Sequence, residues 1–287
     1  MKLLRRSTIQ LLRFPFSFFL LPVYLFALGQ LVYKNNGRAL LIFGILHLLV
    51  YPASNGYNSY MDRDESPIGG LRNPMAPTRQ LFYTTIFMDA LALCLGVLIS
   101  GWFVAGLAVY ILASRAYSWR GIRLKRYPVL GWLIVSTCQG ALVFFLVYHG
   151  SHEPAILDVP VRAMLASSLL VGGFYPLTQI YQHESDRRDG VKTISLMLGI
   201  RGTFLFTAFI YSLAFGMLAF YFIEDAFSVK EFFVLATCML PVLVYFLIWA
   251  VRAWKDPGKA DFRHTMRMNW LASVCTNAGF LAIWLMQ

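Results

Sequence analysis

Long uninterrupted runs of apolar residues dominate the pattern of hydrophobic and polar positions along this chain. An apolar run of about 20 residues can cross the hydrocarbon layer of a bilayer as a helix. Nine such runs can be read, each predicting a transmembrane helix: 14–33, 38–56, 81–99, 101–115, 128–149, 161–181, 202–223, 230–251 and 268–286. The pattern therefore predicts an all-α membrane protein with nine transmembrane helices in one bundle.

The composition agrees with a membrane protein. The chain is 58% hydrophobic and only 14% charged, with a mean hydropathy of +0.60, whereas a soluble domain carries about 25% charged residues. No linker or low-complexity segment divides the runs, so we predict a single polytopic membrane domain over residues 1–287. The first run is longer than the core of a typical signal peptide and has no A-x-A-like cleavage site, so we expect it to remain as a helix.

The basic residues lie almost entirely on one side of the predicted helices. If the N-terminus is cytoplasmic, only four of the 25 Lys and Arg residues fall outside, namely Lys34, Arg38, Arg162 and Lys230. The positive-inside rule then predicts a cytoplasmic N-terminus. We interpret the formal net charge of +11 as an insertion signal, not as a sign of nucleic-acid binding. The expected location is a bacterial inner (plasma) membrane.

Two of the predicted inside segments resemble each other. Residues 51–65 read YPASNGYNSYMDRDE, and residues 175–189 read YPLTQIYQHESDRRD. Aligned without a gap at an offset of 124 residues, from 51 to 175, they share the pattern Y-P-x4-Y-[NQ]-x3-D-R-x-[DE]. Each copy ends a predicted helix, the second and the sixth, on the same side of the membrane. We interpret this as an internal duplication of a four-helix unit.

Each copy predicts a row of oxygen ligands on one helix face, because residues at i, i+4 and i+7 of a helix are neighbours. The two rows are Asn58, Asp62 and Glu65 in the first copy, and Gln182, Asp186 and Asp189 in the second. Amide and carboxylate oxygens suit Mg²⁺, which usually binds substrate phosphates as well. Two facing rows therefore predict a magnesium–diphosphate site. The alternative is that these acids only mark solvated helix ends, paired with neighbouring arginines.

Three stretches carry a resemblance to a known family. They are Asn58-x3-Asp62, the segment from Glu184 to Thr193 followed by Leu198-Gly199, and residues 117–131. Together they resemble the motifs of the UbiA superfamily of intramembrane aromatic prenyltransferases, which has nine helices, a first motif N-x3-D-x3-D and a second motif D-x3-D.

The chain looks like an atypical member of that family. The last acid of the first motif falls on Ser66, and the first acid of the second motif falls on Gln182. Asp64 or Glu65 can substitute for the former, and Glu184 matches an extra acid of the second motif.

The resemblance implies an Mg²⁺-dependent transfer of an isoprenyl group from a prenyl diphosphate to a lipophilic, usually aromatic, acceptor. The metal ligands expected on this basis are Asn58, Asp62, Glu65, Gln182, Glu184, Asp186 and Asp189, with Asp62 and Asp186 as the catalytic pair. The residues expected to bind substrate are Arg72, Lys125, Arg187, Lys192 and Tyr117. The partners are then the two substrates and the bilayer, and the site lies at the cytoplasmic face.

Two other interpretations remain open. Duplicated halves, prolines within helices and polar residues near membrane depth are also found in secondary transporters. A transporter, however, places its site near the middle of the bilayer, whereas these acids lie at helix ends. The replaced acids also fit a degenerate homologue that binds a prenyl diphosphate without turning it over.

Overall fold

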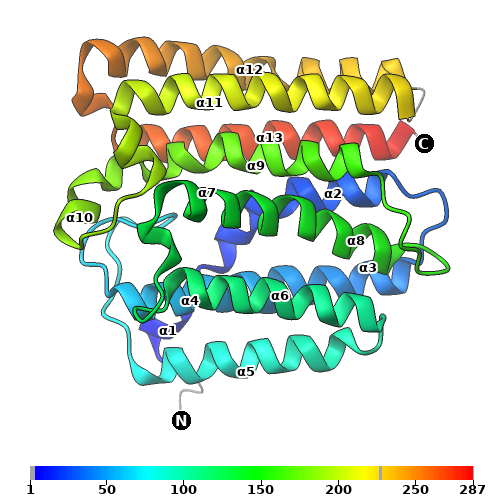
Figure 1. Ribbon diagram of the computed structural model, residues 1–287, viewed down its shortest axis with the longest axis horizontal. Helices are drawn as coiled ribbons and strands as arrows, with labels where there is room; N and C mark the ends of the chain where they lie inside the picture. The colour runs from blue at the N-terminus through cyan, green and yellow to red at the C-terminus, as the bar shows by residue number, and fades with distance from the viewer. Residues whose placement is uncertain (1–3, 226–227, 287) are drawn as a thin grey trace.

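The computed structural model describes residues 4–225 and 228–286, and its helices run side by side along one long axis (Figure 1). Its α-helices are α1 (Arg6–Leu12), α2 (Leu21–Gly29), α3 (Asn36–Phe43), α4 (Tyr51–Asp62), α5 (Arg79–Gly96), α6 (Gly101–Ser118), α7 (Pro128–Ser136), α8 (Val143–Ser151), α9 (Val161–Gln179), α10 (His183–Arg188), α11 (Ile194–Phe220), α12 (Val229–Lys255) and α13 (Phe262–Met286).

Short helices of other types join several of these into longer rods. The 3₁₀ segments are η1 (Phe14–Leu20), η3 (Leu124–Arg126), η5 (Ile180–Gln182) and η7 (Pro257–Lys259), and the π segments are η2 (Gly44–Val50), η4 (Thr137–Leu142) and η6 (Tyr221–Asp225). The π segment η2 directly precedes Pro52 in the first turn of α4. Because proline donates no hydrogen bond and crowds the preceding turn, a locally widened helix accommodates it.

Seven helical rods in the described part of the chain are long and apolar enough to cross a membrane: Arg6–Gly29, Asn36–Asp62, Pro128–Ser151, Val161–Arg188, Ile194–Glu224, Val229–Lys255 and Phe262–Met286. Each of these rods overlaps one of the nine predicted runs. The two remaining predicted runs correspond to α5 and α6, of 18 residues each. They lie beside the seven rods but are not among them. The all-helical prediction is confirmed, while a count of nine spans stays a prediction.

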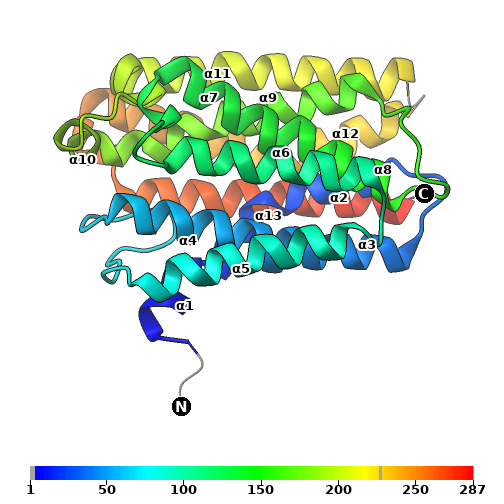
Figure 2. The ribbon, with the colours of Figure 1, turned by 60° about the horizontal axis from the view of Figure 1, so that its bottom comes forward.

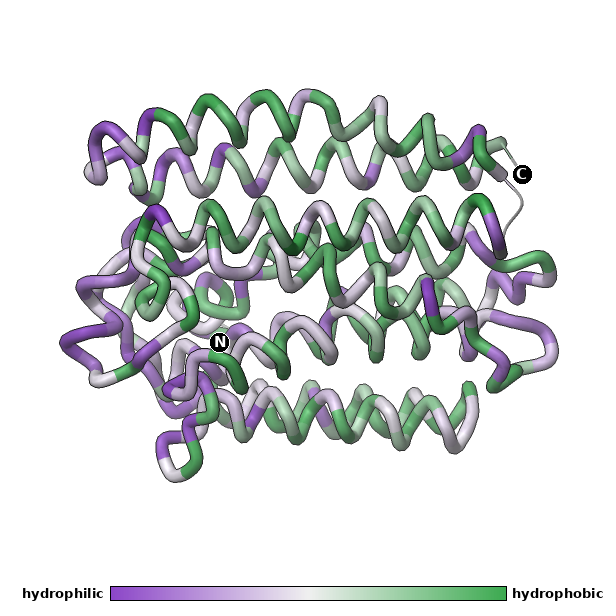
Figure 3. The backbone as a smooth tube through the Cα atoms, turned by 45° about the horizontal axis from the view of Figure 1, so that its top comes forward, coloured by the Kyte–Doolittle hydropathy of each residue, from purple (hydrophilic) through white to green (hydrophobic). Residues whose placement is uncertain are grey.

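Polar residues gather at the ends of the rods, and the tube between the ends is mostly hydrophobic (Figure 3). The connections from α4 to α5, α6 to α7, α10 to α11 and α12 to α13 all lie at the end that carries α10 (Figure 1). Together with the helix ends that adjoin them, these connections hold most of the basic residues. The α10 end of the bundle is therefore its basic end.

The first helix is fastened to the connection that follows α4. In Figure 2, α1 lies beneath α4 and α5, apart from the main stack. The Gln10 side chain accepts a hydrogen bond from the Met75 backbone N–H (2.8 Å) and donates one to the Asn73 carbonyl (3.3 Å). Arg13, in the left-handed conformation that ends α1 (φ 49°), donates to the Gly69 carbonyl (3.1 Å). Residues 69–75 are therefore held in place by the N-terminal helix.

A largely buried ion pair joins α5 to α6. The Arg115 Nε donates to Asp89 Oδ2 at 2.9 Å, and the side chains are only 15% and 11% exposed. Arg115 also donates to the Thr85 carbonyl (3.3 Å), and its guanidinium lies 4.0 Å from the centre of the Tyr57 ring. The two buried charges of these helices, Asp89 and Arg115, are therefore paired with each other inside the protein, which removes most of the cost of burying them.

We expect Asp89→Leu to lower the free energy of unfolding by about 3–5 kcal/mol, because it leaves the Arg115 guanidinium buried without its counter-charge. The measurement is thermal or denaturant unfolding of the protein in detergent micelles. The double variant Asp89→Leu/Arg115→Met should recover most of the loss. Equal destabilisation in the single and double variants would mean that the ion pair is not the stabilising feature.

Candidate active site

A cavity opens among the helices at the α10 end of the bundle. Its volume is about 310 Å³, and it is lined by side chains from the first, second, fourth and last rods, among others. Its inner part is apolar, with Leu20, Val135, Leu170 and Phe174. The polar lining residues include Arg13, Asn58, Asp62, Asp64, Tyr117, Ser118, Lys125, Gln179, Tyr181, Gln182, Asp186, Asp189 and Thr193. Charged and apolar side chains therefore line adjacent parts of the same cavity.

The two copies of the repeated motif meet in this cavity. Asn58 and Asp62 come from the end of α4, and Gln182 and Asp186 come from η5 and α10. All four line the same cavity although the copies are far apart in the sequence. The two sets of oxygen ligands thus face a common space.

The first copy differs from its prediction in where the helix ends. The helix α4 stops at Asp62, and Arg63 takes the left-handed conformation (φ 55°), with its N–H bonded to the Ser59 carbonyl (3.0 Å). The predicted i, i+7 alignment of Glu65 with Asn58 is therefore wrong, since the helical period has ended. Glu65 is exposed and is not among the residues lining the cavity, while Asp64 is.

In the second copy, the rod tightens after Pro176 into the 3₁₀ turn η5 before α10 begins. Gln182, Asp186 and Asp189 nevertheless all line the cavity. Glu184 points to the surface, where its carboxylate pairs with Arg188 one turn later. The structure thus places three of the four acids and amides expected from this copy at the cavity, and Glu184 outside it.

A turn after α10 fixes the carboxylate of Asp186. Gly190 has φ +64°, a conformation that other residues rarely adopt, and the turn lets the Val191 N–H reach the Asp186 carbonyl (2.9 Å). Thr193 Oγ1 donates to Asp186 Oδ2 (2.9 Å) and accepts from the Leu196 N–H (3.3 Å), so it also caps α11. The G-x2-T spacing in the sequence has this structural basis.

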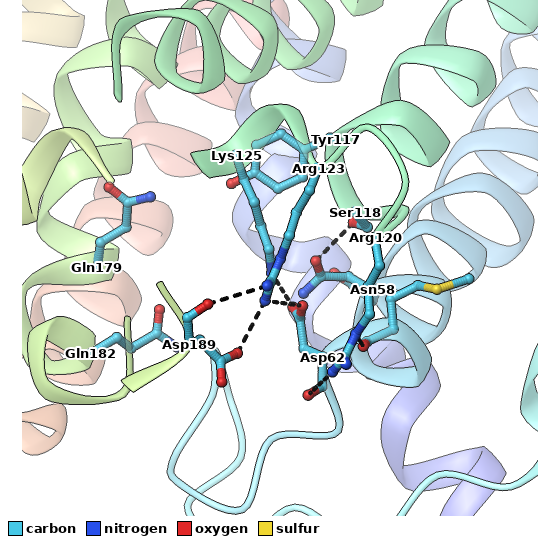
Figure 4. Close-up of polar contacts among 12 residues, drawn as sticks. Asn58, Asp62, Tyr117, Ser118, Arg120, Arg123, Lys125, Gln179, Gln182 and Asp189 are labelled. Atoms are coloured by element: carbon cyan, nitrogen blue, oxygen red, sulfur yellow. Dashed lines mark hydrogen bonds and ion pairs between the residues drawn. The ribbon is translucent and has the colours of Figure 1, made fainter. Parts of the chain in front are cut away.

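Basic residues from the segment between α6 and α7 reach across the cavity mouth. Lys125 Nζ forms an ion pair with Asp62 Oδ2. The Arg123 Nη2 atom lies 3.1 Å from Asp189 Oδ2 and 3.6 Å from Asp62 Oδ1, and Figure 4 shows its guanidinium between the two carboxylates. Arg123 therefore links the two copies of the motif electrostatically. Close by, Ser118 Oγ donates to the Asn58 amide oxygen (2.8 Å).

A further cation comes from the N-terminal rod. Arg13 is buried and lines the cavity, donating to the Asn55 and Gly69 carbonyls at 3.3 and 3.1 Å. Its charge acts on Asp64, which lies in the connection after α4. Burial, followed by repulsion from Asp62, raises the pKa of Asp64 to about 6, although Lys125 and Arg13 oppose that change. The negative charge at the mouth is therefore only partly compensated.

The site fits a magnesium ion that substrate helps to bind. Among the described residues, no three His, Cys, Asp or Glu side chains form a group that could hold a metal ion by themselves. The Oδ1 atom of Asp62 is buried and accepts no hydrogen bond from those residues. Mg²⁺ is commonly held by one or two carboxylates, with waters and substrate phosphates completing its octahedron. The donor set, with this carboxylate oxygen free of hydrogen bonds, matches that pattern.

The predicted substrate-binding residues divide into two groups. Tyr117 and Lys125 line the cavity. Arg72, Arg187 and Lys192 are exposed and are not among its lining residues.

Residues of the site that the sequence did not single out come mostly from outside the repeat: Arg13, Ser118, Arg123 and Gln179. Arg123 lies in the stretch 117–131, which resembles a loop of the family. That resemblance was the feature of the sequence that could have indicated a role for Arg123. Nothing in the sequence pattern distinguishes Arg13 from the other basic residues of the N-terminus.

These features define an integral membrane protein with an acid-rich, partly basic cavity at one end of a helical bundle. The sequence model of the UbiA prenyltransferase family matches residues 17–273, and the chain belongs to that family. The predicted family membership is thereby confirmed.

Two curated relatives match parts of the chain. The chain is 28% identical over 149 residues to the bacteriochlorophyll synthase 33 kDa chain of Cereibacter sphaeroides, covering 51% of this chain and 49% of that protein. It is 31% identical over 90 residues to the chloroplastic homogentisate solanesyltransferase of Arabidopsis thaliana, covering 30% of this chain and 23% of that protein. The matches thus span about half and about a quarter of these relatives.

Solved structures share the fold over nearly the whole chain. A UbiA homologue from Archaeoglobus fulgidus, bound to DMAPP and Mg²⁺, superposes with a TM-score of 0.73 at 19% identity, covering 98% of this chain and 100% of that one. The apo structure of a UbiA homologue from Aeropyrum pernix K1 gives a TM-score of 0.70 at 17% identity, covering 94% of this chain and 98% of that one. At 19% and 17% identity, this structural similarity shows that the chain shares the fold of these proteins and nothing further.

We expect Thr193→Val to lower the free energy of unfolding by about 2 kcal/mol, because it removes both the cap of α11 and a hydrogen bond to a carboxylate. Thr193→Ser keeps the hydroxyl and should stay close to the unmodified protein. Thermal unfolding in detergent compares the three. If the serine variant loses as much as the valine variant, the hydroxyl is not what stabilises the turn.

Proposed function

We propose that the protein transfers an isoprenyl group from a prenyl diphosphate to a lipophilic, aromatic acceptor in the membrane, in a reaction that depends on Mg²⁺. The observation that carries the proposal is the convergence of the two repeated motifs on one cavity, with Asp62 and Asp186 both lining it. Family membership supports the reaction class. The A. fulgidus homologue bound to DMAPP and Mg²⁺ supports the donor class and the metal.

In this proposal the oxygen ligands at the mouth hold Mg²⁺. When bound, the ion neutralises the diphosphate and makes it a better leaving group. Asp62 and Asp186 are the principal ligands, assisted by the amide oxygens of Asn58 and Gln182. Asp64 takes the place of the family's last acid in the first motif, since it lines the cavity and Glu65 does not. Asp189 faces the same space, and Glu184 is left out because it lies on the surface.

The basic residues at the mouth bind the diphosphate oxygens. Arg13 and Lys125 line the cavity, and Arg123 lies beside both Asp62 and Asp189. Ammonium and guanidinium groups donate charge-assisted hydrogen bonds to phosphate oxygens, and guanidinium does so in pairs. Lys125 is retained from the predicted set, and Arg13 and Arg123 replace Arg72, Arg187 and Lys192 as our candidates for this role.

The apolar interior takes the prenyl chain. Tyr117 and Tyr175 line the cavity between the acids and the apolar part, and their hydroxyls are hydrogen-bonded to each other. Loss of the diphosphate leaves an allylic cation, which the face of an aromatic ring stabilises. Closely packed side chains also keep water away from that cation, so that the acceptor captures it.

The same arrangement favours a particular topology. The α10 end is basic and would face the cytoplasm of a bacterial inner membrane by the positive-inside rule. The helices α5 and α6 complete nine spans, because their charged residues Asp89 and Arg115 are paired inside the protein.

The test is an assay with Mg²⁺, labelled prenyl diphosphates of several lengths and a panel of aromatic acceptors. We expect Asp62→Asn and Asp186→Asn to lower transfer by about 100-fold or more, the usual effect of losing a group that stabilises developing charge. Glu65→Gln and Glu184→Gln are matched controls, since both acids belong to the repeated motif but are exposed. They should stay within about twofold, as surface substitutions generally do.

Three outcomes would contradict the proposal. Equal loss in the control variants would mean that the cavity residues are not the ones that matter. Mg²⁺-dependent binding of prenyl diphosphate by the unmodified protein, without product, would identify a degenerate homologue. Movement of a solute across vesicles without diphosphate chemistry would favour a transporter.

A further inference from the structure

A second, larger hollow lies on the outer side of the last rod, at the same basic end of the bundle. Its volume is about 900 Å³. It is lined by Arg72, Asp261, Phe262, Arg263, Met266, Arg267, Trp270, Leu271 and Val274. All of these except Arg72 and Asp261 belong to α13, so the hollow follows one face of that helix. We call it the α13 groove.

The helix α13 has two distinct faces along its first half. Arg263, Arg267, Trp270 and Val274 are exposed and are spaced at i, i+4, i+7 and i+11, which aligns them on one face. The charged residues come first, and the apolar ones follow toward the middle of the rod. The groove therefore changes from cationic to apolar along the direction in which a membrane changes from headgroups to hydrocarbon.

The groove is separate from the cavity described above. Asn269 and Ser273, on the opposite face of α13, line that cavity and not the groove. Between the two spaces, the ring of Phe19 packs edge-on against Trp270, with centroids 5.2 Å apart. Phe19 lines the cavity, and Trp270 lines the groove. A ligand in the groove is thus outside the proposed reaction site.

The charge in the groove is predominantly positive. Among the described residues, Arg72, Arg263 and Arg267 take part in no ion pair within 4.0 Å. The one acid, Asp261, is occupied, because its Oδ1 atom accepts from the His264 N–H (2.7 Å) and interacts with His264 Nδ1 (2.8 Å). Three guanidinium groups therefore face the groove with one engaged carboxylate.

We propose that the α13 groove binds an anionic phospholipid of the surrounding bilayer. The phosphate of the headgroup lies against Arg263, Arg267 and Arg72, since guanidinium matches phosphate oxygens with paired hydrogen bonds. An acyl chain follows Trp270, Leu271 and Val274. A zwitterionic lipid fits less well, because the positive group beyond its phosphate meets the same arginines.

The first test is native mass spectrometry of the detergent-solubilised protein titrated with phosphatidylglycerol or phosphatidylcholine. We expect preferential binding of phosphatidylglycerol. In Arg263→Gln/Arg267→Gln the affinity for it should fall roughly 20-fold, about fivefold for each basic residue removed from an anionic lipid surface. The matched control is Arg252→Gln/Lys255→Gln, which removes the same charge from exposed residues of α12 at the same end but outside the groove. It should change the affinity by less than about twofold, as exposed charges distant from a ligand generally do.

The second test is read first on the unmodified protein, so its main result does not depend on the arginine variants folding. Trp270 is half-exposed in the groove and reports on its occupant. In nanodiscs, brominated phosphatidylglycerol should quench tryptophan emission more than brominated phosphatidylcholine. That difference should vanish in Trp270→Phe, and added inorganic diphosphate should leave it unchanged.

Equal binding of the two lipids would overturn the proposal, as would an equal loss in the α12 control variant. Reversal of the quenching by inorganic diphosphate would also overturn it, because the groove would then be a site for soluble anions. None of these results depends on whether the protein transfers prenyl groups.

Discussion

The need to compensate buried charge is the constraint on which the rest of this structure depends, because a bundle surrounded by lipid has no water to solvate its ionisable groups. Two solutions are used. Between α5 and α6, Arg115 and Asp89 form an ion pair in which each charge compensates the other. At the cavity mouth, acids from two distant segments outnumber the bases that reach them, and Asp62 keeps one buried oxygen without a hydrogen bond. The first arrangement stabilises the fold. The second leaves carboxylate charge at the cavity mouth that a bound cation would compensate.

The segment between α6 and α7 has a central part in this balance. Lys125 and Arg123 neutralise Asp62, and Arg123 also reaches Asp189 of the other motif. The connection therefore holds the two copies at a fixed separation by attraction, where like charges alone would push them apart. In the proposed reaction the same groups are already oriented toward the place where a diphosphate would add negative charge, so little reorganisation is required.

Much of this could be predicted from the sequence, because membrane helices and an ungapped repeat leave clear patterns. The cavity contains seven of the predicted site residues: Asn58, Asp62, Lys125, Tyr117, Gln182, Asp186 and Asp189. Glu65 was misplaced because helical spacing holds only while the helix continues, and the left-handed Arg63 ends it. Arg13 was missed because its position depends on tertiary contacts with residues far along the chain. The two helices α5 and α6 are less apolar than the seven rods, and the buried charges that they carry, Asp89 and Arg115, are paired with each other.

The hydrogen bonds of α1 have a consequence for engineering relatives of this protein. Gln10 and Arg13 bind backbone groups of residues 69–75, so the first helix and this connection form one mechanical unit at the edge of the cavity. A hybrid that takes its N-terminal helix from one homologue and its residues after α4 from another would lose these contacts. Such hybrids should exchange both segments together, even though the rest of the first rod and the whole second rod lie between them in the chain.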